Sequence, residues 1–237
     1  MTNPTPSINN PELLRIRDQA SKIWQESEQI ETEVFLESGY IQDASDMVAE
    51  YGRYRPESNF ITVRDKNVVL GAVRVILSNT SVGLKTVNDI RAGRLETNDA
   101  GSQLLDEYPS SKIALDVGTL AVDKSYRGVR IPLSDMVSSM LFSGILDLAD
   151  QLDSTTTAPN TSVARRPVVT ASFDEEYALF IRSIVGNGIH LLGPATADYM
   201  GSPTVPALID CLQVREDDLK KPQDERLFEW IGKLTTL

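Results

Sequence analysis

Apolar residues recur at helical spacing near the start of the chain and at strand spacing further along. Over residues 13–37 they recur every three to four positions, which predicts an amphipathic helix that ends at Gly39. A shorter helix and a loop are expected over 43–58. Two β-rich runs, 60–64 and 68–77, flank a polar turn and predict an antiparallel hairpin.

The second half of the chain alternates between strand and helix patterns. The expected elements, in chain order, are short helices near 86–92 and 102–108, a strand at 115–122, a helix reaching about 150, a strand at 154–158, a helix at 174–184, strands at 190–192 and 205–214, and a charged C-terminal helix. No internal repeat or long linker divides them. We therefore expect one α+β domain (an α/β sandwich with a mixed central sheet flanked by helices) over 13–237, after a polar, disordered tail at 1–12.

Charge and composition limit the classes of function that the chain could have. The chain has 23 basic and 34 acidic residues, a net charge of −11, which disfavours nucleic acid and anionic membranes as partners. One cysteine, Cys211, excludes an intramolecular disulfide, and no Cys/His spacing suits zinc, so no metal is expected. No apolar run is long enough to span a membrane and no secretory signal opens the chain. These features predict a cytoplasmic protein.

A strand–turn–helix junction over 115–141 is the strongest chemical feature. Its turn carries Arg127, Gly128 and Arg130, and Pro132 suits the first turn of the helix that follows. A helix start exposes unpaired N–H groups and a positive dipole end, and therefore favours phosphate. Two arginines beside it would neutralise a pyrophosphate or a phosphopantetheine phosphate. The alternative is an ordinary junction with surface arginines.

Several segments in the same order are similar to one enzyme group. They are VFLESGY (34–40), EYGRYRPES (50–58), VLGAVRV (69–75), DVGTLAV (116–122) with YRG (126–128), LGP (192–194) and PTVPALID (203–210). The chain thereby resembles the GNAT-type N-acyltransferases, in the branch of acyl-homoserine-lactone synthases and long-chain N-acyl amino acid synthases. The resemblance implies a mixed, mostly antiparallel sheet. It also implies an acyl-carrier-protein or acyl-CoA thioester as donor, no tightly bound cofactor, and a small-molecule amine as acceptor.

Two departures from the branch bear on its chemistry. In the donor loop, Arg130 and Pro132 stand where the superfamily has small residues, which favours a looser grip on a single phosphate and hence an acyl carrier protein as partner. Two positions that are acidic in the branch are occupied by Gly52 and Arg55 in this chain. A strand position that is usually arginine in the branch is occupied by Thr119. These changes argue against lactone synthesis itself.

The resemblance and the residue chemistry together give candidate site residues. For the donor, the resemblance implies the strand positions Leu120, Ala121 and Val122, whose backbone N–H groups would polarise the thioester carbonyl, and the loop positions Arg127, Gly128, Val129 and Arg130. Asp116 is the first candidate base, because burial raises a carboxyl pKa toward neutrality; its alternative is a structural bond to backbone or to Arg74. Glu50 is the second candidate, with a solvated loop carboxylate as the alternative.

Three further residues are candidates for substrate contact. Arg74 is expected on a half-buried strand, where it would pair either with an acceptor carboxylate or with a protein carboxylate. Phe35 and Trp24 would line an acyl pocket, or form core. The sequence thus predicts an N-acyltransferase that moves a fatty acyl group to a small amine. A catalytically silent thioester- or partner-binding protein and an acetyl-CoA-dependent acetyltransferase are the alternatives.

Overall fold

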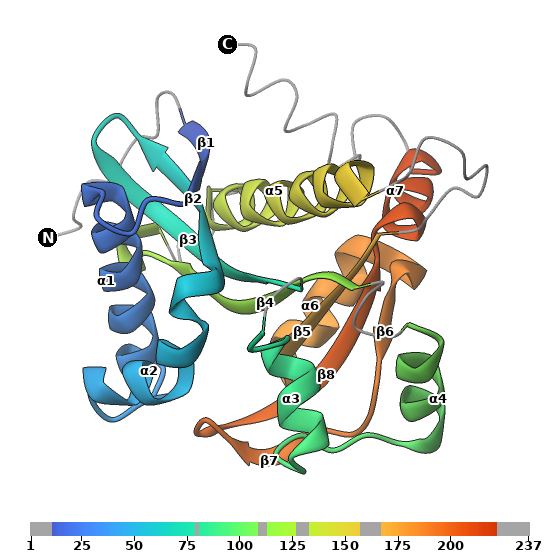
Figure 1. Cartoon of the computed structure of the whole chain (residues 1–237). Helices are drawn as coiled ribbons and strands as arrows, with labels where there is room; N and C mark the ends of the chain where they lie inside the picture. Colours follow the sequence, from blue (N-terminus) through green and yellow to red (C-terminus); the bar gives the residue numbers. More distant parts are fainter. Residues whose placement is uncertain (1–10, 79–80, 109–112, 127–132, 157–166, 222–237) are drawn as a thin grey trace, which may run out of the picture.

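A computed structural model describes residues 11–78, 81–108, 113–126, 133–156 and 167–221. A mixed eight-stranded sheet runs through the molecule in the order β1-β2-β3-β4-β5-β8-β6, with β7 paired to β8 (Figure 1). The strands are β1 (Pro11–Ile16), β2 (Ser58–Asp65), β3 (Val68–Leu77), β4 (Ile113–Val122), β5 (Val168–Asp174), β6 (Ile189–Leu191), β7 (Thr196–Tyr199) and β8 (Ser202–Asp210).

Helices cover both faces of this sheet (Figure 1). The α-helices are α1 (Lys22–Glu37), α2 (Ala44–Tyr51), α3 (Lys85–Arg91), α4 (Asp99–Glu107), α5 (Leu133–Thr156), α6 (Glu175–Val185) and α7 (Cys211–Leu219); the 3₁₀ turns are η1 (Gly52–Glu57), η2 (Lys124–Tyr126) and η3 (Gly186–Gly188). Helices α5, α6 and α7 share the largest apolar core with one face of the sheet. On the other face, α1 and α2 pack against β3 and β4, and α3 and α4 against β4, β5 and β8.

The sheet separates into two halves between β4 and β5, its one parallel pair. These strands pair only from Ile113↔Val168 to Val117↔Ala171. Beyond that point β4 continues beside β3 as far as Val122, while β5 continues beside β8 as far as Asp174. The pairing of β3 with β4 passes from Val75↔Val117 to Arg74↔Thr119, so Gly118 is an extra residue in β4. A bulge bends its strand and increases the local twist, and here it lies where β4 leaves β5.

Most of the predicted elements are confirmed, as is the fold class. The hairpin of 60–64 and 68–77, the strand at 115–122 and the helix at 174–184 match β2, β3, β4 and α6. The short helices near 86–92 and 102–108 match α3 and α4 within a few residues. The sheet is mixed and mostly antiparallel, as expected.

The predicted N-terminal helix begins later than expected. Residues 11–16 form β1, an edge strand that pairs with β2, and Pro11 and Glu12 of the predicted tail belong to it. Helix α1 starts at Lys22, because the Ser21 hydroxyl accepts the Trp24 N–H at 3.2 Å and caps it. The other tail residues, 1–10, lie outside the described part of the chain.

Two assignments near the C-terminal half were wrong. Residues 154–156 of the predicted strand 154–158 are the last turn of α5, while the strand that follows this helix is β5, where no strand was predicted. Its adjacent residues Val168 and Val169 are both fully buried, so β5 is covered on both faces. Such a strand lacks the alternation of apolar and polar residues that marks a half-exposed strand in the sequence. The predicted strand 205–214 ends at Asp210, whose carboxylate accepts the Gln213 N–H at 3.0 Å and begins α7. No helix in the described ranges has the length and apolar character needed to cross a bilayer.

Candidate active site

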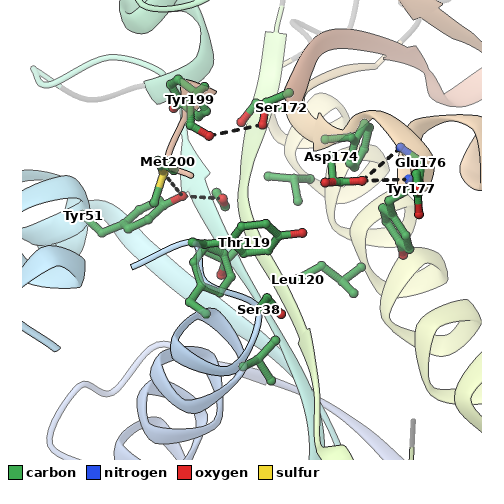
Figure 2. Close-up of a pocket in the computed structure, with 17 residues that line it drawn as sticks. Ser38, Tyr51, Thr119, Leu120, Ser172, Asp174, Glu176, Tyr177, Tyr199 and Met200 are labelled. Atoms are coloured by element: carbon green, nitrogen blue, oxygen red, sulfur yellow. Dashed lines mark hydrogen bonds between the residues drawn. The ribbon is translucent and has the colours of Figure 1, made fainter. Parts of the chain in front are cut away.

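A cleft of about 430 Å³ lies where β4 and β5 diverge (Figure 2). One wall is formed by β4 from Val117 to Leu120, and the opposite wall by β5 from Ser172 to Asp174. The remaining sides come from the end of α1, from Tyr51 of α2, from the start of α6 and from the β7–β8 hairpin. The bulge and the separation of the two strands therefore create the cleft, and the helices close it.

The divergence exposes backbone groups to the cleft. Successive residues of a strand direct their N–H and C=O groups to opposite edges. Along residues 118–122 one edge of β4 pairs with β3, whereas the other has lost its neighbour β5. Some N–H groups of this segment therefore face the cleft without a strand partner. Such groups suit a carbonyl oxygen that gains negative charge.

Tyr51 fixes the bulge from the α2 side. Its hydroxyl donates to the Gly118 carbonyl oxygen at 2.7 Å, as Figure 2 shows. Burial raises the pKa of the Tyr51 phenol well above its usual value, and the nearby Glu31 carboxylate adds to this. The phenol therefore stays protonated, and it holds the carbonyl at the point where the strands separate.

The β5 side of the cleft is acidic. Asp174 caps α6 by accepting the Glu176 N–H at 2.9 Å, and the Ser202 hydroxyl donates to its other carboxylate oxygen. Burial, followed by the Asp174 charge, raises the pKa of the neighbouring Tyr40 phenol. Among the described residues that line the cleft, Asp174 and Glu176 carry the charges, and both are negative. This wall favours a cationic group such as an ammonium.

Arg74 is bound inside the protein. Its guanidinium makes a two-point ion pair with Glu31 of α1, at 2.8 Å from Nε and 2.6 Å from Nη2. The Thr119 hydroxyl donates to the same carboxylate at 2.5 Å. Burial alone would lower the pKa of Arg74, but the Glu31 charge outweighs it and raises that pKa. The prediction that Arg74 binds an acceptor is therefore replaced by its structural alternative: it joins α1 to the cleft strand β4.

A second buried charge cluster lies behind the cleft. The Lys85 ammonium lies 2.6 Å from Asp89 and 3.2 Å from Glu50, and it donates to the Tyr199 hydroxyl at 2.5 Å. Burial raises the pKa of the Tyr199 phenol, so this residue also stays protonated. The Tyr199 ring lines the cleft while its hydroxyl is held by the cluster. The cluster thus fixes the end of β7, directly before the turn of the β7–β8 hairpin.

The structure places Asp116 away from the cleft, on the α3 side of β4. Its carboxylate accepts the Thr86 N–H at 2.7 Å and the Thr170 hydroxyl at 2.9 Å. The N-cap residue of α3, Leu84, supplies no side-chain cap, so Asp116 takes that role. Burial raises the pKa of Asp116 to about 6, as expected, but the fully buried carboxylate does not line the cleft. Its predicted role as base is replaced by helix capping.

Glu50 is also engaged elsewhere. It lines a separate surface pocket with Arg53 and Arg94, and its carboxylate lies 2.5 Å from Arg94 and 3.2 Å from Lys85. Burial would raise the pKa of Glu50, but the hydrogen bond from Arg94 and the Lys85 charge together lower it. A carboxylate with a lowered pKa and two cationic partners is a poor base. The alternative of a solvated loop carboxylate does not describe it either.

The remaining predicted residues fall into three groups. Phe35 and Leu120 line the cleft. Ala121 and Val122 follow Leu120 on β4 but are buried, opposite Ala72 and Gly71 of β3. Trp24 is fully buried against Phe60, with ring centroids 4.8 Å apart, in a core cluster that does not reach the cleft. The donor-loop residues Arg127, Gly128, Val129 and Arg130 lie outside the described part of the chain.

Sequence reasoning missed most of the residues that line the cleft, and four of them matter most for its shape and charge. They are Tyr51, Asp174, Glu176 and Met200. Asp174 had a usable signal, because an aspartate directly before an amphipathic helix is a typical N-cap. The other three reach the cleft only through the packing of α2, α6 and the β7–β8 hairpin, which no local pattern reveals.

Solved structures of other proteins have a similar fold. No protein-family model and no curated protein sequence matches the chain. Among solved structures, it is similar to FeeM, an N-acyl amino acid synthase from uncultured soil microbes, with a TM-score of 0.60 and 16% identity over 87% of this chain and 94% of that one. It is also similar to the AHL synthase LasI, with a TM-score of 0.50 and 12% identity over 85% of this chain and 90% of that one. At these identities the likeness concerns the fold, and the chain has the GNAT acyltransferase fold in the form seen in these synthases.

Proposed function

We propose that this protein is an N-acyltransferase that moves an acyl group from a phosphopantetheine thioester to the amine of a small molecule. The observation that carries this proposal is the cleft between β4 and β5. It combines apolar walls, an exposed strand edge and an acidic rim within one space of about 430 Å³. Each of these parts matches one need of the reaction.

The apolar part of the cleft suits an acyl chain. Val34 and Phe35 of α1, Val117 and Leu120 of β4, and Phe173 of β5 contribute its carbon surface. Burying a chain against such a surface contributes about 0.8 kcal/mol per methylene group. A two-carbon acetyl group would gain little here, so the cleft favours a longer acyl group over acetyl.

The strand edge and the acidic rim suit the reacting groups. Those N–H groups of residues 118–122 that face the cleft would polarise the thioester carbonyl. Asp174 and Glu176 would attract the ammonium form of the acceptor, and Glu176 would take one of its protons to give the neutral amine that attacks. The amine nitrogen then attacks the carbonyl carbon, the carbon–sulfur bond breaks, and the second proton lost by the nitrogen passes to the departing phosphopantetheine thiolate.

The donor is a carrier-bound thioester in this proposal. The Arg127–Gly128 pair would contact its phosphate, as the resemblance implies, and the acyl carrier protein is our preferred carrier over coenzyme A. The chain carries a net charge of −11 and would repel an acidic partner, so a local basic group must dominate that contact. A cytoplasmic location would give access to such thioesters.

A specific observation favours a second candidate, a protein that binds acyl thioesters without transferring them. The three charged residues expected to act on substrates, Asp116, Glu50 and Arg74, are all held by partners within the protein. In this reading the cleft is a ligand site for sensing or for a partner. The two candidates differ only in turnover.

One experiment separates them. The purified protein is incubated with acyl-CoA and acyl-carrier-protein donors of 2 to 16 carbons and a panel of amines, and both released thiol and acylated amine are measured. Acylated product supports the transferase. Donor binding by native mass spectrometry without any product supports the sensor, and a chain that binds no donor overturns both.

The matched variants are Leu120→Trp, which fills the cleft from β4, and Leu179→Trp on the exposed side of α6. Leu179 is 60% exposed and does not line the cleft. We expect Leu120→Trp to abolish transfer and Leu179→Trp to leave it intact. Equal activity in the two variants would place the reaction elsewhere.

A further inference from the structure

The tip of the β7–β8 hairpin crosses the narrow end of the cleft. Tyr199 pairs with Ser202, which leaves Met200 and Gly201 as a two-residue turn. Their φ angles of +51° and +77° are both left-handed, as a type I′ turn requires. The first position of such a turn is usually Asn, Asp or Gly, so Met200 occupies a position that is unfavourable for its side chain.

The turn is held on both sides. A Cβ atom on Gly201 would lie 2.6 Å from the carbonyl oxygen of Gly39, so the turn touches the connection between α1 and α2. On the other side, the Tyr199 hydroxyl donates to Asp89 at 2.5 Å. The hairpin therefore spans from the β5–β8 half of the sheet to the α1–α2 half, and its tip cannot move far without breaking one of these contacts.

Met200 points its side chain into the cleft at the vertex formed by the two strands. In Figure 2 its sulfur lies beside the Tyr51 hydroxyl, 4.0 Å away. That hydroxyl holds the carbonyl of Gly118, the first β4 residue beyond the last pair with β5. Met200 thus lies where the cleft begins, whereas the opposite, wider end lies toward Val122, after which the donor-loop residues follow in the sequence.

We propose that Met200 sets the length of acyl chain that the cleft accepts, by closing its narrow end. This inference rests on the proposed function. A thioester that enters from the wider end of the cleft would direct its acyl tail toward the vertex, and the last carbons would meet the Met200 side chain. Methionine is unbranched and flexible, so it fits against a chain end of variable shape.

The size of the residue should then determine the preferred donor. Met200→Ala removes three heavy atoms from the narrow end and leaves room for about as many methylene groups. Each newly buried methylene should raise kcat/KM about fourfold, which corresponds to about 0.8 kcal/mol. Met200→Trp fills the same end and should favour donors a few carbons shorter. Alanine and tryptophan both carry a Cβ atom, so they share the left-handed backbone cost of Met200 and differ in size.

The test measures kcat/KM for donors of 2 to 16 carbons with the wild-type chain, both Met200 variants and the control Leu179→Ala. Opposite shifts of the preferred length in Met200→Ala and Met200→Trp, with no shift in the control, support the proposal. Unchanged length preference, or a uniform loss across all lengths, would overturn it while leaving the transferase intact.

Two further measurements keep the result decisive. Thermal unfolding reports whether each variant folds. Met200→Leu, of similar volume, should keep the preferred length at the wild-type value. An alanine variant that does not fold is re-examined as Met200→Gly, which suits the left-handed backbone, and a tryptophan variant that does not fold is re-examined as Met200→Phe. A wild-type chain that neither binds nor uses any donor would overturn the proposed function and this inference together.

Discussion

The Arg74 guanidinium and the Glu31 carboxylate form a two-point ion pair, with N···O distances of 2.8 and 2.6 Å, between β3 and α1. Both side chains are at most 5% exposed. Taking the two charges out of water is costly, and their attraction offsets that cost only while both partners are present. Because Thr119 donates to the same carboxylate, the pair also holds a wall of the cleft.

Removing one partner of this pair should destabilise the fold strongly. Glu31→Gln leaves the Arg74 charge buried without its main partner, and we expect a loss of about 3–5 kcal/mol in the free energy of unfolding, measured in urea. The exposed pair Arg64–Glu12, with an N···O distance of 3.1 Å, is the control, and Glu12→Gln should cost less than about 1 kcal/mol. Replacing both partners, as Glu31→Leu with Arg74→Met, should recover most of the loss. If Glu31→Gln were as mild as the control, the pair would have no structural role.

The raised pKa of Asp116 gives a stability prediction with a definite sign. Its folded-state pKa is about 6 against an ordinary value of 3.8, mainly because of burial, so the folded protein binds the proton more tightly than the unfolded chain. The contribution is fully present below about pH 4 and is lost as the pH rises through about 6. Two pKa units correspond to about 3 kcal/mol at most.

Asp116→Asn removes this titration. Relative to the wild-type protein, the variant should therefore gain up to about 3 kcal/mol of unfolding free energy between pH 4 and pH 7. Urea unfolding at several pH values measures it, with the exposed Asp106→Asn on α4 as the control, which should follow the wild-type curve. A constant difference between Asp116→Asn and wild type at every pH would mean that the buried carboxyl does not titrate in this range.

These residues also show which features of the structure could be predicted from the sequence. The strand at 115–122 and the hairpin of 60–64 and 68–77 follow from local periodicity, whereas the fold was expected from the resemblance of several segments to the GNAT-type N-acyltransferases. The raised pKa expected for Asp116 follows from a carboxyl on a buried strand, and the structure agrees. Its role does not follow, because α3, the helix that it caps, approaches from another part of the chain.

The cleft itself could not be predicted from local sequence patterns. Its shape depends on one extra residue, Gly118, in the pairing of β3 with β4, and on the early end of the pairing between β4 and β5. Register is a relation between strands, so one strand's sequence does not contain it. The partner of Arg74 was similarly open: a buried arginine requires a carboxylate, but only the packing of α1 on β3 identifies Glu31.

Loss of Arg127 should weaken donor binding. A charge-assisted contact between a guanidinium and a phosphate contributes about 1.5–3 kcal/mol, so Arg127→Ala should raise the donor Kd by about 10- to 150-fold. Calorimetric titration with an acyl-CoA and with an acyl carrier protein measures it, and the effect should diminish in high salt. Arg182→Ala, at an exposed position of α6, is the charge-matched control and should bind normally. Equal affinities in the two variants would remove Arg127 from the donor site.

Glu176 is the carboxylate whose removal tests the acceptor side of the cleft. It lines the acidic wall at the first turn of α6, where Asp174 supplies the cap and where the Glu176 side chain is exposed. Glu176→Gln preserves the size and leaves the cap in place, but the amide cannot take a proton from the attacking amine. We expect kcat/KM for amine acylation to fall about a hundredfold, with donor Kd unchanged, because general-base catalysis contributes on that order.

The adjacent Glu175 makes the comparison specific. It carries the same charge in the same turn of α6 but does not line the cleft, so Glu175→Gln should keep nearly full activity. If both variants lost activity equally, the effect would come from the overall negative charge at the start of α6. Acidic residues are favourable there because the helix dipole is positive at the N-terminus. A pH profile distinguishes the two cases further, because loss of a base removes the acidic limb of kcat/KM, whereas loss of a general charge lowers the whole profile. Full activity in Glu176→Gln would leave Asp174, with its bonds to Ser202 and to the α6 backbone, as the described carboxylate in position to accept the proton.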